Sequence, residues 1–309
     1  MSAPLHAVGR LLTASFGGRF GQVPGPLVEP SAVELAGLRA LRWEGGAGAP
    51  LVLLHGLNSN PWAWARVASL LCVERPVLAL ALPGHGGSPP LPGPWSGAAL
   101  SAAVGAAIDA LGWPRVHLAG HSWGGKLAFH LAASEPARVE RLVLVDPVMP
   151  AGLGPLVGTF PALLRLAFAA ERQVFADAER WQAGRQGVVY LGFGSDDVDD
   201  RYWAGGFAQD PQGRYHPVLS EPDFQSIVRD CLADDLSALL PHLQAPTLLL
   251  LPTFTVSLWP GATRPLRRTG KVQPVRLWGD HTVHHSNPLD TSDAVRAFLA
   301  DGADPTPEP

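Results

Sequence analysis

Short apolar runs recur along the chain and alternate with longer stretches that favour helix. These runs are apolar throughout, which is typical of strands in a parallel sheet whose two faces are both covered by helices. We expect buried strands at Pro50–Leu54, Val77–Leu82, Val116–Ala119, Leu142–Val145, Thr247–Leu251 and Val272–Trp278. We expect helices at Pro61–Leu71, Ala98–Leu111, Gly124–Ala133 and Ser292–Leu299. This alternation predicts an α/β fold with a doubly wound, mostly parallel sheet.

The regular pattern has a distinct beginning and one interruption. Two short segments at 32–35 and 38–43 flank Ala36-Gly37 and predict an opening hairpin. Between residues 150 and 240 no strong strand pattern occurs, and helical stretches are expected at Pro161–Ala170 and Glu171–Gln182. The predicted organisation is an N-terminal arm at residues 1–30, a core at 31–149 and 241–301, an inserted cap at 150–240 and a disordered tail at 302–309.

The strongest chemical signal is the pentapeptide Gly120-His121-Ser122-Trp123-Gly124. It directly follows a predicted strand and precedes a predicted helix, which is the context of a nucleophile elbow. The strained turn needs small residues two places before and two places after the serine, and the two glycines supply them. The motif therefore predicts that the hydroxyl of Ser122 is a nucleophile projecting above the sheet.

A second motif, His55-Gly56-Leu57, follows the strand expected at 50–54. Acyl transfer needs hydrogen-bond donors aimed at the oxyanion that develops during attack. We expect those donors to be the backbone N–H groups of Leu57 and Trp123. His55 is expected to be a structural turn histidine, and Asn58 either a polar contact to substrate or a surface turn residue.

Four motifs together resemble the α/β-hydrolase family: HG at 55–56, LPGHGGS at 82–88, GHSWGG at 120–125 and GDH at 279–281. The resemblance covers roughly residues 30 to 300 and is to the capped branch of esterases, cofactor-free haloperoxidase-like enzymes, carbon–carbon bond hydrolases and dehalogenases. It implies the α/β-hydrolase fold with an inserted helical cap. Ala81 departs from the family, which usually has an acidic residue there, but that acid is normally structural.

The resemblance places the general base just after the last strand, where His281 stands. His284 and His285 are close alternatives, and the spacing of the three histidines also raises the question of a metal site. Because no cysteine or distant acidic cluster supports a metal, we expect neither a metal nor another cofactor.

The triad acid has no candidate in its usual place. The family usually carries it after the strand expected at 247–251, yet no Asp or Glu occurs from Leu236 through Gly279. Asp146 ends the strand after the nucleophile's, where one subgroup of haloalkane dehalogenases carries its triad carboxylate. We therefore expect the triad Ser122, Asp146 and His281, with a turn-capping role for Asp146 as the alternative. Asp280, adjacent to the base, is expected to point away from its ring.

A serine nucleophile favours acyl transfer over dehalogenation or epoxide opening, which proceed through an alkyl-enzyme ester. We expect a hydrolase that cleaves a small or medium apolar carboxylic ester. The alternatives are a carbon–carbon bond hydrolase, a cofactor-free haloperoxidase-like enzyme, and a ligand-binding protein with weak turnover. The last alternative is suggested by the missing acid at the usual place.

Charge and hydropathy exclude several other classes of partner. The net charge of -4 gives no basic surface for nucleic acid or an anionic membrane. No apolar stretch reaches the roughly 18 residues of a membrane span, and no convincing signal peptide opens the chain. With only two widely spaced cysteines, we expect buried thiols and a cytoplasmic location.

Overall fold

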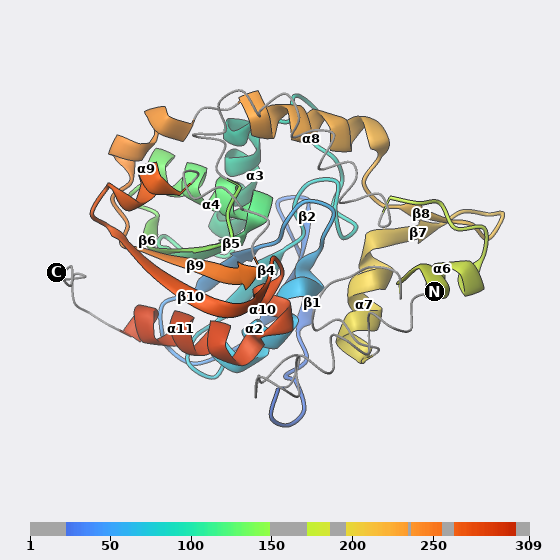
Figure 1. Ribbon diagram of the computed structural model, residues 1–309, viewed down its shortest axis with the longest axis horizontal. Helices are drawn as coiled ribbons and strands as arrows, with labels where there is room; N and C mark the ends of the chain where they lie inside the picture. The colour runs from blue at the N-terminus through green and yellow to red at the C-terminus, as the bar shows by residue number, and fades with distance from the viewer. Residues whose placement is uncertain (1–22, 149–171, 186–195, 234–235, 255–262, 301–309) are drawn as a thin grey trace.

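The computed structural model describes residues 23–148, 172–185, 196–233, 236–254 and 263–300. These residues form an eight-stranded sheet in the order β1-β2-β4-β3-β5-β6-β9-β10 (Figure 1). The pairs β1–β2 and β2–β4 are antiparallel, and all later neighbours are parallel. The α/β fold with a mostly parallel sheet is therefore confirmed.

The strands of this sheet are β1 (Ser31–Leu35), β2 (Leu38–Trp43), β3 (Leu51–Leu54), β4 (Val77–Leu80), β5 (Val116–His121), β6 (Val139–Val145), β9 (Thr247–Phe254) and β10 (Val272–Asp280). The helices around it are α2 (Ala65–Leu71), α3 (Gly97–Asp109), α4 (Ser122–Ser134), α9 (Arg264–Arg267), α10 (Val283–Ser286) and α11 (Pro288–Ala300). Short 3₁₀ helices lie at η1 (Pro61–Trp64), η3 (Leu236–Ala238) and η4 (Leu240–His242).

Alternate residues of the central strands pack into two different helical layers. Val52 and Leu54 of β3 belong to the cluster that contains α3 and α4, whereas Leu51 and Leu53 belong to the cluster that contains α2 and α11. In Figure 1 these helix pairs lie on opposite faces of the sheet. Because both faces are covered, every residue of β3 is buried, and this explains its uninterrupted apolar sequence.

Several elements extend further than the sequence predicts. Helix α4 begins at Ser122 rather than Gly124, and α11 begins at Pro288 rather than Ser292. Strand β10 continues to Asp280, and the short helix α10 that follows was not predicted. These ends contain glycine, polar and histidine residues with weak intrinsic preferences, so tertiary contacts decide their conformation.

The segment between β6 and β9, called the insert below, is only partly described. It contains α6 (Ala178–Arg185), α7 (Asp197–Gly206), the antiparallel hairpin of β7 (Phe207–Gln209) and β8 (Tyr215–Pro217), and α8 (Glu221–Ala233). The helix expected at 161–170 lies outside the described residues. The other, expected at 171–182, is wrong in its first part, because Phe175 pairs with Tyr215 in an extended bridge.

The end of the predicted N-terminal arm is attached to the core by hydrogen bonds of Val28. The backbone N–H of Val28 donates to Ser69 Oγ at 2.7 Å, and the indole N–H of Trp43 donates to the carbonyl of Val28 at 2.8 Å. Glu29 pairs with Arg201 of the insert at 2.6 Å. These anchors come from residues far along the chain, so the Gly- and Pro-rich composition of the arm does not reveal them.

The structure can be compared with two expectations from the sequence, one about the cysteines and one about membrane-spanning helices. Cys72 and Cys231 are both buried, as the sequence predicts, and burial raises the pKa of the Cys72 thiol. None of the described helices is long and apolar enough to cross a membrane.

A buried charged network fastens the insert to the core. Arg66 of α2 lies 3.2 Å from Asp199 Oδ1 of α7, and these side chains are 2% and 1% exposed. Asp199 Oδ1 also lies 2.8 Å from His285 Nε2 of α10, and Asp196 approaches Arg66 from the solvent side at 2.5 Å. A guanidinium this deeply buried needs a carboxylate partner, because an uncompensated buried charge costs several kcal/mol.

We expect Asp199→Asn to lower the free energy of unfolding by about 3 kcal/mol, because Arg66 then loses its buried carboxylate partner and keeps the more exposed carboxylate of Asp196. Urea denaturation followed by circular dichroism measures this loss. The matched control is Asp197→Asn on the same helix, whose exposed pair with Arg201 is expected to contribute less than about 1 kcal/mol. Equal losses in the two variants would contradict a fastening role for the buried network.

Candidate functional site

Ser122 occupies a strained turn at the junction of β5 and α4. Its φ is +54°, in the left-handed region that residues with a side chain rarely adopt. A Cβ on Gly120 would lie 2.2 Å from the carbonyl oxygen of Gly124, and one on Gly124 would lie 2.3 Å from that of His55. Both positions therefore require glycine, and the turn has the geometry of the predicted nucleophile elbow.

Asp146 stands at the carboxyl end of β6, beside the end of β5. It is fully buried and has a φ of +40°, so the chain turns sharply as it leaves the strand. Its N–H donates to the carbonyl of Leu250 at 3.0 Å, and the N–H of Val148 donates to the carbonyl of Ser122 at 3.1 Å. These bonds fix the turn after β6 against β9 on one side and the nucleophile elbow on the other.

His281 lies in the turn after β10, and its Nδ1 is 2.6 Å from Asp146 Oδ2. An Nδ1–H donated to the carboxylate sets the tautomer in which Nε2 is the basic nitrogen. Asp280 has a different environment, since its Oδ1 accepts bonds from the backbone and hydroxyl of Thr282 and from the hydroxyl of Ser286. The structure thus brings together the histidine and the carboxylate that the sequence singled out.

The two predicted oxyanion donors belong to segments that converge on Ser122. Trp123 is the second residue of α4, where backbone N–H groups have no partner within the helix and the helix dipole favours negative charge. Leu57 follows Gly56, on which a Cβ would lie only 3.3 Å from the Cβ of Ser122. The loop after β3 therefore passes directly beside the nucleophile.

That loop is held by two buried histidines. His55 donates from Nδ1 to the carbonyl of the next residue at 2.8 Å and accepts the N–H of Leu82 at 3.0 Å. His85 donates from Nδ1 to Pro83 at 2.9 Å and accepts the N–H of Asn58 at 3.2 Å. Burial lowers the pKa of His55 well below its usual value and that of His85 to about 4, so both stay neutral. His55 thus has the structural role expected of it.

The two histidines that rivalled His281 face other groups. His285 lies against Arg66 and Asp199, and the ring of His284 packs between those of Trp64 and His121. Within the part of the chain that the structure describes, no group of three or more His, Cys, Asp or Glu side chains is arranged to hold a metal ion.

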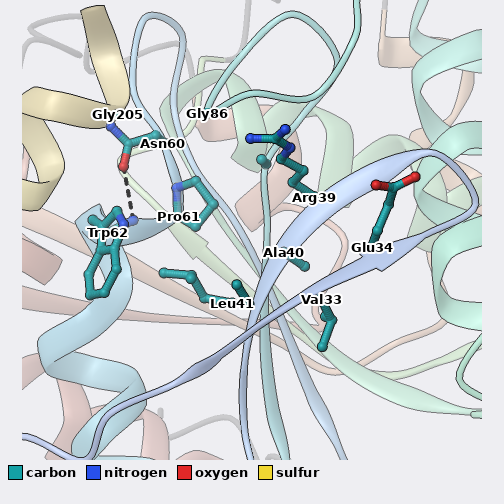
Figure 2. Close-up of a pocket in the computed structure, with 12 residues that line it drawn as sticks. Val33, Glu34, Arg39, Ala40, Leu41, Asn60, Pro61, Trp62, Gly86 and Gly205 are labelled. Atoms are coloured by element: carbon teal, nitrogen blue, oxygen red, sulfur yellow. Dashed lines mark hydrogen bonds between the residues drawn. The ribbon is translucent and has the colours of Figure 1, made fainter.

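A groove of about 390 Å³ lies elsewhere, where the β1–β2 hairpin meets η1 and α7 (Figure 2). Arg39, Pro61 and Trp62 are among its lining residues, and Asn60 Oδ1 there accepts the N–H of Trp62 at 3.0 Å. Ser122, Asp146 and His281 are not part of its lining, so this groove is distinct from the catalytic candidates.

Comparison with known proteins identifies the family to which the chain belongs. The family model described as the alpha/beta hydrolase fold matches residues 49–212, which is just over half of the chain. The chain belongs to the α/β-hydrolase fold family. The matched region contains the loop after β3, the nucleophile elbow and the turn after β6.

Individual relatives agree with this membership. The chain is 30% identical over 271 residues to the sn-1-specific diacylglycerol lipase ABHD11 of Mus musculus, a match that covers 83% of each protein. It is 38% identical over 112 residues to lipase LipV of Mycobacterium tuberculosis. That match covers 36% of this chain and 42% of the lipase, so this α/β-hydrolase matches less than half of that relative's length. The structure of E-2-(acetamidomethylene)succinate hydrolase superimposes with a TM-score of 0.75 over 89% of this chain and 100% of that one; at 20% identity this likeness shows the fold alone.

Buried neutral histidines predict that this α/β-hydrolase loses stability in mild acid. Burial lowers the pKa of six described histidines: His55, His85, His117, His121, His284 and His285. Below a pH of about 6.5 the unfolded chain takes up protons that the folded chain refuses, so the free energy of unfolding falls.

Between about pH 6.5 and its pKa in the folded protein, each such histidine lowers the free energy of unfolding by up to about 1.4 kcal/mol for each unit by which the pH falls. Urea titrations at pH 7.5, 6.5, 5.5 and 5.0 measure the summed slope. His117→Gln removes one of these groups away from the catalytic candidates and is expected to make the slope shallower. Stability that does not change from pH 7.5 to 5.0 would contradict the neutral, buried state of these rings.

Proposed function

We propose that this α/β-hydrolase is a serine hydrolase that cleaves a small or medium apolar carboxylic ester through an acyl-enzyme. Ser122 is the nucleophile, His281 the general base and Asp146 the orienting acid. The observation that carries the proposal is the 2.6 Å contact between His281 Nδ1 and Asp146 Oδ2, beside an elbow serine with a φ of +54°.

In the proposed reaction, Ser122 Oγ attacks the ester carbonyl while His281 Nε2 takes its proton. The carbonyl oxygen becomes an oxyanion that accepts the N–H groups of Leu57 and Trp123. The imidazolium, stabilised by Asp146, then gives its proton to the departing alcohol. A water molecule, deprotonated by His281, attacks the acyl-enzyme and returns Ser122 to its hydroxyl form.

Two further considerations support ester hydrolysis. The alternative of a ligand-binding protein with weak turnover rested on the missing acid after β9, and the contact of Asp146 with His281 removes that reason. The relatives named as a diacylglycerol lipase and as lipase LipV carry names of ester-cleaving enzymes, which favours the same class of bond for this chain.

We also propose that residues 150–240 form a cap over this site. Asn60 Nδ2 donates to the carbonyl of Tyr202 at 2.7 Å, and Arg172 Nη1 donates to Asn58 Oδ1 at 3.4 Å. Both contacts join the insert to the loop after β3, which carries the proposed donor Leu57. Trp181 stacks on Tyr215 at 4.8 Å, and the apolar cluster that contains both rings also includes Ala63 of η1, so it joins the insert to the core.

Asp146→Asn is expected to keep the fold but to lower kcat on p-nitrophenyl butyrate by about a thousandfold or more, because the amide no longer fixes the reactive tautomer of His281. Asp280→Asn is the matched control, next to the base but engaged with Thr282 and Ser286, and is expected to cost less than about tenfold. Steady-state kinetics measures both losses, with circular dichroism to show that each variant is folded. Equal losses would remove Asp146 from the triad.

A further inference from the structure

A row of four aromatic rings, each tilted against the next by 39° to 53°, runs from the core to the proposed general base. The ring centroids are 4.2 Å apart between Trp64 and His284, 4.3 Å between His284 and His121, and 4.6 Å between His121 and His281. These residues come from η1, α10, β5 and the turn after β10. Trp64 and His284 are each 1% exposed and His121 is 4% exposed, so His281 rests on a rigid, buried support.

His121 contacts each part of the proposed catalytic apparatus. Its Nε2–H donates to the backbone carbonyl of His281 at 2.8 Å. Its Nδ1 is so close to the loop after β3 that a Cβ on Gly56 would lie 2.9 Å from it. Its backbone is bonded to that of Ser122. One residue therefore links the base and the oxyanion loop through its side chain and the nucleophile through its backbone.

The donated bond defines the state of the His121 ring. With the proton on Nε2, Nδ1 carries a lone pair, and this buried atom has no hydrogen-bond partner among the described residues. Burial, followed by the neighbouring rings of His284 and His281, holds the pKa of His121 well below its usual value. His121 therefore remains a neutral donor while a positive charge develops on His281 during catalysis.

Asp146 and His121 hold different parts of the same residue. The carboxylate fixes the imidazole through Nδ1, whereas His121 fixes the backbone carbonyl from which that side chain extends. A ring held at one atom alone can still move with its backbone, and a displacement of about 1 Å at a reacting group can cost about a hundredfold in rate.

We propose that His121 is a positioning residue, which keeps His281 in reach of Ser122 by holding the backbone carbonyl and the ring of the base. This role is distinct from the triad chemistry and rests on the proposed function. It also gives the residue before the nucleophile a reason to be histidine: a ring that packs against the ring of His281 and a donor long enough to reach its carbonyl.

The test compares three variants with different losses. His121→Phe keeps a ring against His281 but lacks the donor, and His121→Gln keeps a donor near the position of Nε2. His284→Phe keeps a ring against His121 and leaves the hydrogen bond from His121 to His281 untouched. We expect kcat on p-nitrophenyl butyrate to fall about ten- to a hundredfold in His121→Phe with little change in KM. We expect His121→Gln to recover most of that loss and His284→Phe to stay within about threefold of the parent.

A second readout does not depend on turnover. The Nδ1 proton shared by His281 and Asp146 should give a low-field proton NMR signal in the parent and in His121→Gln, and a broadened or missing signal in His121→Phe. An inactive parent that shows this pattern would contradict ester hydrolysis but support the positioning role. Equal kcat and equal signals in His121→Phe and His121→Gln would overturn the role of His121.

If His121→Phe does not fold, His121→Asn replaces it, because its shorter amide falls short of the His281 carbonyl. The proposal then predicts the same contrast in kcat and in the low-field signal between the Asn and Gln variants. A His121→Asn protein as active as His121→Gln, with the same low-field signal, would overturn the proposal.

Discussion

The hydrogen bond between Asp146 and His281 joins two strand ends that are not neighbours. Strand β9 lies between β6, which Asp146 follows, and β10, which His281 follows. The hydrogen bond between Asp146 and His281 therefore has to reach across the end of β9. The positive φ of Asp146 turns the chain sharply at the end of β6, and the bond from its N–H to Leu250 of β9 fixes that turn. The carboxylate of Asp146 and the imidazole of His281 then meet across the intervening strand.

Electrostatics around this bond are controlled by burial. Asp146 is fully buried, and a buried carboxylate is tolerated only when it is paired and hydrogen-bonded. The rings nearest the site, His121 and His284, have pKa values well below the usual range and stay neutral, so they add no positive charge beside His281. The charged network of Arg66 and Asp199 is kept apart, at the junction of α2 and α7, where it fastens the insert.

The sequence predicted the parts of this protein whose patterns are local. Strand β3 is apolar at every position because both of its faces are buried, and the elbow glycines are required by close backbone contacts. Asp146 was predicted from the resemblance to a subgroup of haloalkane dehalogenases with a carboxylate at this strand end, together with the absence of Asp and Glu from Leu236 through Gly279. The row of ring contacts through His121 could not be predicted, since its four rings come from four separate elements. The β7–β8 hairpin was also missed because its strands are short, although the turn sequence Asp210-Pro211-Gln212-Gly213 was an available signal.

The central claim, that Ser122 is activated by a base held by Asp146, is tested most directly by trapping the covalent intermediate. The protein is mixed with p-nitrophenyl butyrate, quenched in acid during the first turnovers, digested and analysed by mass spectrometry. We expect a butyryl group on the peptide that contains Ser122 in the parent, and a much slower appearance of that group in Asp146→Asn. Hydrolysis without any acylated Ser122, or with the acyl group on another residue, would contradict the account.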